Sequence, residues 1–204
     1  MNTTDLPERG WVTRHGHVDL TGRPALFLDR DGTVIDNVPY LDDPARVSLL
    51  TGARETIAAF RSAGYAVIIV TNQSGVARGF VSPERYRAVE AAVLAALGPG
   101  LVDATYVCPF HPVHPWRKPE PGMLLAAAHD LGLRLADSTM VGDTLADVMA
   151  GARAGVAHVT HVLTGHGVPE RAEVAAWVNV REDMNLPRLS FADSLGNLYL
   201  RDLG

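Results

Sequence analysis

The sequence contains two closely spaced pairs of aspartates, Asp29-x-Asp31 and, much further along the chain, Asp143 and Asp147. Two carboxylates about 4 Å apart repel each other by about 4 kcal/mol at an effective dielectric constant of about 20. A cluster of ionised carboxylates therefore requires a cation or raised pKa values. Oxygen ligands favour a hard cation, and at a site that handles phosphate this ion is Mg²⁺. We expect Asp29, Asp143 and the backbone carbonyl of Asp31 to be its protein ligands.

The spacing of Asp29 and Asp31 suits two different catalytic roles. On a turn that leaves a strand, residues i and i+2 can both face a bound phosphate. We predict that Asp29 is the nucleophile that forms an acyl-phosphate. Asp31 would protonate the departing alcohol oxygen and then deprotonate the attacking water. Gly32 allows the tight turn and the approach of backbone N–H groups to the phosphate oxygens.

Two further segments supply groups that stabilise a phosphoryl group. Thr71 offers a hydroxyl, and the adjacent Asn72 amide adds a donor. Lys118 supplies a point charge, and the proline after it restricts Lys118 to an extended conformation. Arg117 is predicted to bind a second anionic group of the substrate. Asp147, near the start of a predicted helix, can turn back to hold Lys118 or a metal-bound water.

Alternating strands and helices position these residues. The order predicts an α/β fold in which helices cover both faces of a parallel sheet. Ligands of such sheets bind beyond the carboxyl ends of the strands, and Asp29, Thr71, Cys108 and Asp143 each follow a predicted strand. Strands are predicted at 25–28, 65–70, 102–107, 139–141 and 158–163, and helices at 53–62, 82–97, 122–131 and 145–154.

The two ends of the chain have less regular patterns. Residues 1–22 are polar and mixed, which predicts an arm laid against the domain or partly loose. Residues 23–204 are predicted to form a single domain. Within it, Trp177-Val178-Asn179-Val180 suggests a last strand, followed by a terminal helix.

Four motifs, each after its strand, resemble those of the haloacid dehalogenase superfamily. The resemblance covers about residues 24–165 and is greatest to the branch that contains D-glycero-D-manno-heptose 1,7-bisphosphate phosphatase and histidinol-phosphatase. It implies a Mg²⁺-dependent phosphatase with a three-layer, Rossmann-like fold. It also implies substrate binding by Gly32, Thr33, Asn72, Gln73, Ser74, Arg78, Arg117 and Asp147. The motifs are Asp29-Arg-Asp-Gly-Thr33, Thr71-Asn-Gln-Ser-Gly75, Arg117-Lys-Pro119 and Gly142-Asp-Thr-Leu-Ala-Asp147.

Segment lengths indicate that the fold lacks a cap domain. Members of the superfamily insert caps after the first motif or between the second and third. Residues 33–52 have room only for a flap and a short strand, and one helix and one strand fill residues 71–118. An open site leaves specificity to loops, chiefly residues 36–41, 73–80 and 108–117.

The loop before Lys118 departs from the pattern of this branch. The branch has a structural zinc site with the pattern Cys-x-His, a spacer and Cys-x-Cys. Here Phe110 stands where the first histidine would be and the two later cysteines are missing. Cys108, His111 and His114 are three potential ligands, whereas a structural zinc site needs four. We therefore expect no zinc, with Phe110 and Trp116 packing in its place.

Composition narrows the range of partners. The 204 residues are 47% hydrophobic and 20% charged, as in a globular protein. The net charge of -5 argues against nucleic acid as the main partner. The single cysteine suits a reducing cytoplasm. Residues 1–11 have no apolar run of signal-peptide length and the longest apolar stretches are strand-sized, so we expect a cytoplasmic protein without membrane contact. We expect a monomer.

Alternative functions remain open at this point. The same residues would serve a histidinol-phosphatase or another sugar or nucleotide phosphomonoesterase. A phospho-receiver signalling module also accepts phosphate on an aspartate beside Mg²⁺ and a lysine. Such a module lacks an acid/base two residues after the nucleophile, so Asp31 argues against it. A catalytically silent subunit is disfavoured because all catalytic side chains are present.

Overall fold

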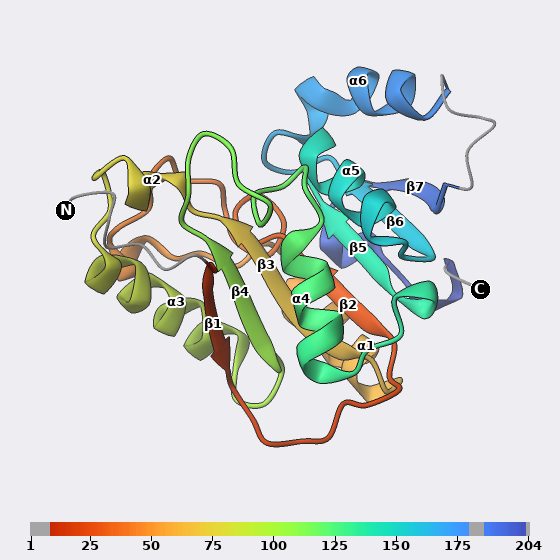
Figure 1. The fold of residues 1–204 in the computed structure, drawn as a ribbon, viewed down its shortest axis with the longest axis horizontal. Helices are drawn as coiled ribbons and strands as arrows, with labels where there is room; N and C mark the ends of the chain where they lie inside the picture. Colours follow the sequence, from red (N-terminus) through yellow and green to blue (C-terminus); the bar gives the residue numbers. More distant parts are fainter. Residues whose placement is uncertain (1–8, 180–185, 203–204) are drawn as a thin grey trace.

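A computed structural model describes residues 9–179 and 186–202 of the chain. Its centre is a seven-stranded sheet with the strand order β1-β4-β3-β2-β5-β6-β7 (Figure 1). Neighbouring strands are parallel except for β1, which runs antiparallel to β4. The predicted α/β fold with a central parallel sheet is confirmed. The strands are β1 (Trp11–Arg14), β2 (Ala25–Leu28), β3 (Ala66–Asn72), β4 (Ala104–Cys108), β5 (Thr139–Gly142), β6 (His158–Val162) and β7 (Arg188–Ala192).

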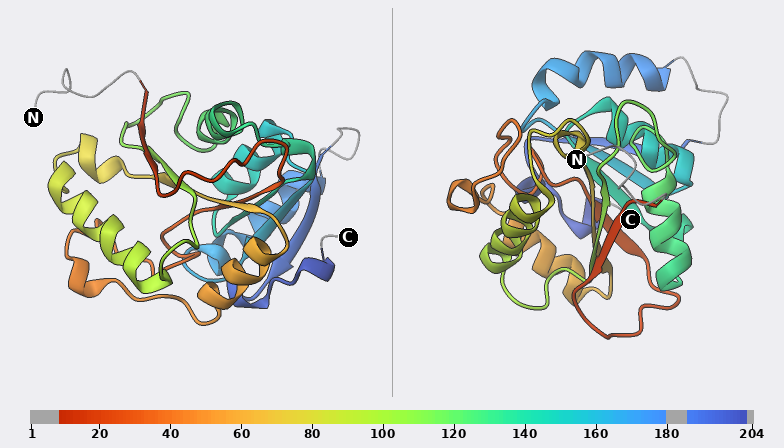
Figure 2. Two further views of the ribbon diagram at one scale, coloured as in Figure 1. Left: turned by 90° about the horizontal axis from the view of Figure 1, so that it is seen from below. Right: turned by 60° about the vertical axis from the view of Figure 1, so that its left-hand side comes forward.

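Helices cover both faces of this sheet, with α1 and α3 on one side and α4 and α5 on the other (Figure 2). The α-helices are α1 (Ala53–Ser62), α2 (Ser74–Ala77), α3 (Pro83–Leu97), α4 (Gly122–Leu131), α5 (Leu145–Ala154) and α6 (Gly167–Asn179). Short 3₁₀ turns lie at η2 (Pro44–Arg46), η3 (Leu135–Asp137), η4 (Leu195–Asn197) and η5 (Leu200–Asp202).

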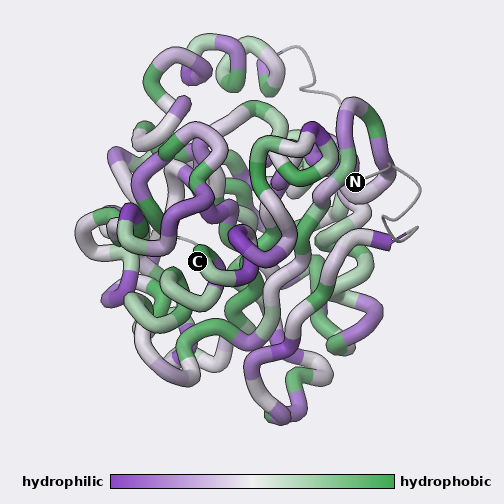
Figure 3. The backbone as a smooth tube through the Cα atoms, turned by 90° about the vertical axis from the view of Figure 1, so that its left-hand side faces the viewer, coloured by the Kyte–Doolittle hydropathy of each residue, from purple (hydrophilic) through white to green (hydrophobic). Residues whose placement is uncertain are grey.

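The central strands are buried on both faces, because successive side chains of a strand point to opposite sides. Phe27 packs in the core beside Met123 of α4, whereas its neighbour Leu28 packs in the core beside Phe60 of α1. Along the whole chain, stretches of hydrophobic residues alternate with stretches of hydrophilic residues (Figure 3). Both cores hold the strands rigidly, so the loops at their carboxyl ends start from fixed positions.

Local signals begin and end the helices where the sequence predicts. Ser82 caps α3 by accepting a hydrogen bond from the Arg85 backbone N–H, and Pro83 occupies its first turn. Thr144 and Asp147 form a reciprocal capping box at the start of α5. Gly155 ends this helix in the left-handed conformation at φ 79°.

The two ends of the chain differ from expectation. Part of the predicted arm, Trp11–Arg14, is an edge strand of the sheet, paired with β4. The strand predicted at 177–180 is wrong: residues 177–179 end helix α6, and residue 180 lies outside the described residues. Glutamate and alanine make residues 170–176 strongly helix-forming, and the short apolar run after them continues the same helix. The last strand is β7, and the described chain ends in 3₁₀ turns instead of a terminal helix.

Helical elements make up the connections that lead into β3 and β4. One helix and a 3₁₀ turn separate β2 from β3, and α2 and α3 separate β3 from β4. No helix of the described segments combines the length and the hydropathy of a membrane span.

Candidate active site

Three neighbouring strands of the sheet, β3, β2 and β5, end at one rim. Thr71 is the second-last residue of β3. Asp29 directly follows β2, and Asp143 directly follows β5. These residues line a cavity of about 170 Å³. The rest of its lining comes from residues at the same edge of the sheet: Asp31, Asn37, Asn72, Lys118, Thr144, Asp147 and His166.

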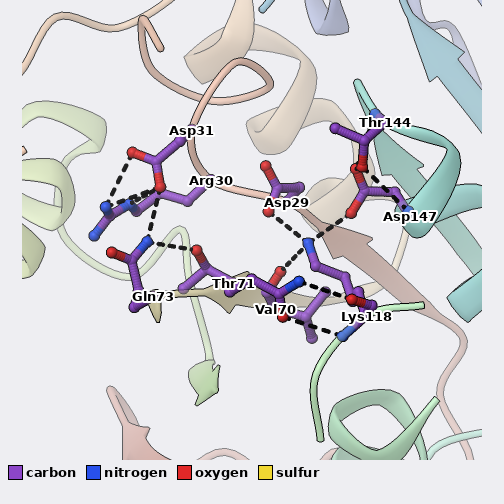
Figure 4. Close-up of polar contacts among 10 residues, drawn as sticks. Asp29, Arg30, Asp31, Val70, Thr71, Gln73, Lys118, Thr144 and Asp147 are labelled. Atoms are coloured by element: carbon purple, nitrogen blue, oxygen red, sulfur yellow. Dashed lines mark hydrogen bonds and ion pairs between the residues drawn. The ribbon is translucent and has the colours of Figure 1, made fainter. Parts of the chain in front are cut away.

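Lys118 connects the aspartates of this rim (Figure 4). Its Nζ donates to Asp29 Oδ1 at 2.5 Å and to the backbone carbonyl of Val70 at 2.9 Å. The same nitrogen lies 2.6 Å from Asp147 Oδ1. Lys118 is buried. Burial by itself lowers the pKa of this ammonium, but the Asp147 and Asp29 carboxylates outweigh burial and raise it.

The aspartates of the rim are short of positive charge. Burial raises the pKa of Asp29 well above its ordinary value, and the carboxylates of Asp147 and Asp143 add to the effect of burial. Burial, together with Asp147, raises the pKa of Asp143 to about 6. One ammonium therefore does not balance the three carboxylates. A further cation at this rim would stabilise their ionised forms.

A divalent metal fits this arrangement of donors. Asp29, Asp143 and Asp147 each offer a carboxylate oxygen, and these oxygens lie within 4.8 Å of one another. Both carboxylate oxygens of Asp147 already have partners, because Oδ2 accepts hydrogen bonds from Thr144 and Oδ1 faces Lys118. Asp29 and Asp143 are less committed, and oxygen donors suit Mg²⁺, so ligation by these two carboxylates stays a prediction. Ligation by the Asp31 carbonyl stays a prediction.

Asp31 is held on the other side of the cavity from Lys118 (Figure 4). Arg30 donates to both of its carboxylate oxygens, at 3.1 and 3.0 Å. Gln73 Nε2 donates to Asp31 Oδ2 and to Thr71 Oγ1, both at 2.8 Å. Because Thr71 Oγ1 accepts this hydrogen bond, its own proton is free to point at a phosphate oxygen.

Asn72 has a role that was not predicted, because it holds the backbone of Lys118. Its side-chain nitrogen donates to the Lys118 carbonyl at 3.0 Å, and its side-chain oxygen accepts from the Lys118 N–H at 3.1 Å. Both ends of the side-chain amide are therefore used to hold the Lys118 backbone. The side-chain nitrogen has a second N–H and Asn72 lines the cavity, so contact of this amide with phosphate stays a prediction.

The turn at Gly32 also differs from expectation. Gly32 has a φ of 87°, which explains the need for glycine. Its N–H donates to the carbonyl of Ile35 at 2.8 Å, so it serves the turn rather than a phosphate. Thr33 is completely buried beneath the turn. Neither residue is among those that line the cavity.

The remaining predicted residues lie further from the aspartates. Ser74 lines an adjoining cavity together with Gln73 and Tyr40. Arg78 donates to the Tyr40 hydroxyl at 2.7 Å and stacks on Phe80. Arg78 and Arg117 are not among the lining residues of either cavity. Substrate binding by these two arginines stays a prediction.

The loop after β6 completes the site and was missed by sequence reasoning. The backbone N–H of His166 donates to Asp143 Oδ2 at 2.7 Å, and His166 lines both cavities. Thr164 Oγ1 donates to the Gly32 carbonyl at 2.5 Å. His166 reads from the sequence as structural or solvated, since no metal-ligand spacing includes it. His166 lies in the loop after β6, and β6 lies beside β5 in the sheet. That strand order is the signal that could have placed His166 near Asp143.

The loop that carries the incomplete zinc pattern is organised by packing and hydrogen bonds. Cys108 is buried at the end of β4, and His111 is exposed. His114 stacks on Phe110, with ring centroids 3.8 Å apart, and its Nδ1 accepts a hydrogen bond from the Trp116 N–H. Trp116 is buried, as predicted, in the core beside Tyr106.

Comparison with known proteins gives consistent relatives. A family model described as HAD-hydrolase-like matches residues 115–190. A D-glycero-beta-D-manno-heptose-1,7-bisphosphate 7-phosphatase of Mesorhizobium japonicum is 44% identical over 165 residues, which cover 74% of this chain and 76% of the relative. A D-glycero-alpha-D-manno-heptose-1,7-bisphosphate 7-phosphatase of Burkholderia mallei is 40% identical over 144 residues, covering 65% of this chain and 76% of the relative.

A solved structure shares the fold at comparable similarity. The D,D-heptose 1,7-bisphosphate phosphatase of B. bronchiseptica, complexed with magnesium and phosphate, is 32% identical with a TM-score of 0.74. The match covers 85% of this chain and 94% of that chain. The order of the strands, the aspartates at their ends and these relatives agree: the chain belongs to the haloacid dehalogenase family of hydrolases, in the group of the heptose 1,7-bisphosphate phosphatases.

Proposed function

We propose that this protein is a Mg²⁺-dependent phosphatase that removes one phosphate from D-glycero-D-manno-heptose 1,7-bisphosphate through a phospho-aspartate on Asp29. The observation that carries the proposal is the position of Lys118 Nζ, 2.5 Å from Asp29 and 2.6 Å from Asp147 at a rim short of positive charge. The heptose substrate and the hydrolysis at position 7 are transferred from the relatives, whose names include both anomers.

In the first step, an oxygen of Asp29 attacks phosphorus and the bond from phosphorus to the sugar oxygen breaks. Asp31 gives its proton to that oxygen, so the sugar leaves as an alcohol. Lys118 and the Thr71 hydroxyl stabilise the charge on the transferring phosphoryl group. Mg²⁺ bound by Asp29 and Asp143 would neutralise the negative charge of the phosphate.

In the second step, water attacks the phosphorus of the acyl-phosphate. Asp31, now a carboxylate, takes the proton of this water, and the bond between Asp29 and phosphorus breaks. Inorganic phosphate leaves and Asp29 regains its carboxylate. The balance of the two steps is one phosphate ester and one water converted into one alcohol and one phosphate.

The finer parts of the proposal rest on composition. One cysteine supports a cytoplasmic location, and a net charge of -5 supports a small-molecule substrate over nucleic acid. The enzyme is proposed to act as a monomer. Ultracentrifugation of the purified protein tests the monomer, and fractionation of the source cells tests the location.

A substrate panel tests the function. Phosphate release is measured with both anomers of the heptose bisphosphate, histidinol phosphate, other sugar phosphates and nucleoside monophosphates, with Mg²⁺ or with EDTA. We expect the highest kcat/KM for one heptose anomer and no turnover in EDTA. A higher kcat/KM for histidinol phosphate would reassign the substrate. A phosphorylated protein that persists for minutes without turnover would instead support a signalling module.

A further inference from the structure

Arg30 is an unusual residue in the first motif because its charge is buried. The residue is only 2% exposed. Its guanidinium carbon lies 5.4 Å from the centre of the Tyr86 ring. A buried charge requires a partner, and removing the partner alone is strongly destabilising. Burial lowers the pKa of Arg30, but the Asp31 carboxylate more than offsets burial and raises it.

The partner of Arg30 is the acid/base candidate. Nε donates to Asp31 Oδ2 and Nη2 donates to Asp31 Oδ1, so both oxygens are held in one plane. The chain turns sharply after Arg30, since the N–H groups of Val34 and Ile35 both donate to the Arg30 carbonyl, at 2.9 and 3.1 Å. This turn lets two adjacent side chains face each other. Arg30 is therefore fixed by the fold, and Asp31 is fixed by Arg30.

Gln73 holds the same carboxylate from the second motif. Its Nε2 bridges Asp31 Oδ2 and Thr71 Oγ1 at 2.8 Å each. Asp31 therefore accepts three hydrogen bonds from Arg30 and Gln73 together, and its carboxylate turns away from Asp29 and Lys118 (Figure 4). Its side chain is 22% exposed and lines the cavity.

We propose that Arg30 and Gln73 are positioning residues that set the direction of the Asp31 carboxylate at the edge of the cavity. This proposal rests on the function proposed above. Arg30 donates to both carboxylate oxygens at once and Gln73 donates to one of them, so the three hydrogen bonds together fix the direction of the side chain. Loss of either donor would let the carboxylate rotate, so its distance to the reacting atoms would no longer be fixed.

The principal test replaces the guanidinium by a neutral side chain. We expect Arg30→Met to lower kcat by about 100-fold, the lower end of what general acid/base catalysis contributes, with KM within threefold of wild type. Arg30→Lys keeps the charge without the two-pronged geometry and should recover part of the loss. Arg61→Met is the matched control: it removes another arginine bonded to a buried aspartate, Asp103, at 2.7 Å, and should leave kcat within twofold of wild type.

A double-mutant cycle separates positioning from general stability. In the Asp31→Asn background, adding Arg30→Met should change the remaining rate of phospho-enzyme hydrolysis by less than threefold, because both substitutions act through one group. Asp31→Asn alone should lower Tm by leaving a buried charge unpaired, and the double variant should recover part of that loss. If Arg30→Met slows hydrolysis equally in both backgrounds, the proposal is overturned.

Other outcomes are also decisive. If Arg30→Met does not fold, Gln73→Glu tests the same contact, since it replaces a donor by a carboxylate of equal size and should lower kcat about tenfold. A folded Arg30→Met that keeps kcat within threefold of wild type overturns the proposal. Wild-type protein that hydrolyses no phosphate ester would refute the proposed function instead, so the two failures are distinguishable.

Discussion

Two clusters of buried ionic side chains lie at opposite ends of the parallel strands. At the amino ends, Arg61 donates to Asp103 Oδ2 at 2.7 Å, and the backbone N–H of Val67 donates to the same oxygen at 2.9 Å. At the carboxyl ends, Lys118 alone is shared by Asp29 and Asp147. The first cluster has one positive and one negative charge. The second has an excess of negative charge.

This difference separates a structural contact from a reactive one. The balanced pair ties α1 to the starts of β3 and β4, and needs nothing further to be stable. In the unbalanced cluster, burial raises the pKa of Asp29 and of Asp143, and the neighbouring carboxylates raise both further. Such perturbed groups gather at functional sites. The excess charge provides the attraction for Mg²⁺ and, through it, for phosphate.

The largest expected effect comes from removing the nucleophile. Asp29→Asn should lower kcat by about 10³-fold or more, while Tm in EDTA is unchanged or higher, because one of the repelling carboxylates becomes neutral. Phosphate release and thermal unfolding are the measurements. Asp42→Asn, a substitution of an exposed aspartate, is the control and should change neither. Substantial turnover by Asp29→Asn would contradict the assignment of the nucleophile.

The next effect distinguishes the two clusters directly. Lys118→Met should lower kcat by about 10²- to 10³-fold, because it removes the positive charge beside the transferring phosphoryl group. Arg61→Met should lower Tm and leave kcat unchanged, since its cluster lies at the other end of the strands. Steady-state kinetics at saturating Mg²⁺ measure both. An equal loss of activity in the two variants would mean that the clusters do not differ in role.

A smaller effect is expected from the residue that holds Lys118. Asn72→Ala removes the hydrogen bonds of its side chain to the Lys118 N–H and carbonyl. The loop should become less precisely placed, and kcat/KM should fall by about tenfold. Asn197→Ala, which removes an exposed contact with Ser194, serves as the control. If Asn72→Ala retains wild-type kcat/KM, the fixed position of Lys118 is unimportant for catalysis.

The smallest effect concerns stability and pH. The pKa of Asp143 is raised from its ordinary value of 3.8 to about 6, so the folded state disfavours the ionised carboxylate. Stability in EDTA should therefore fall as pH rises from about 4 to about 6, by up to about 3 kcal/mol for a shift of about two pKa units. Below pH 4 the carboxyl is protonated in both states and this loss is absent.

Mg²⁺ and one substitution test the origin of that loss. Mg²⁺ binds the ionised aspartates, so it should remove most of the decrease above pH 6. Asp143→Asn should reduce the decrease in stability in EDTA over the same range, leaving the part that comes from the raised pKa of Asp29. Urea unfolding at several pH values measures both effects. A profile in EDTA that is the same for wild type and Asp143→Asn would exclude Asp143 as the cause.

Much of the reactive rim was predictable because its residues are local signals. Asp29, Thr71 and Asp143 each stand where an apolar strand meets a turn, and parallel strands bring such positions together. The contact of Asp147 with Lys118 was also predicted, because Asp147 stands near the start of a helix that follows β5. The strand Trp11–Arg14 was not predicted, because an edge strand of four mostly exposed residues has no continuous apolar run.

The residue types and their order along the chain determined the fold class, the family and the residues at the ends of the strands. Tertiary structure alone decided where side chains without a local pattern act. Asn72 holds the backbone of Lys118, the His166 N–H donates to Asp143, and the buried Arg30 side chain donates to Asp31. The physical reason is that a hydrogen bond depends on the direction and distance of two groups in space, which sequence spacing does not specify across separate strands.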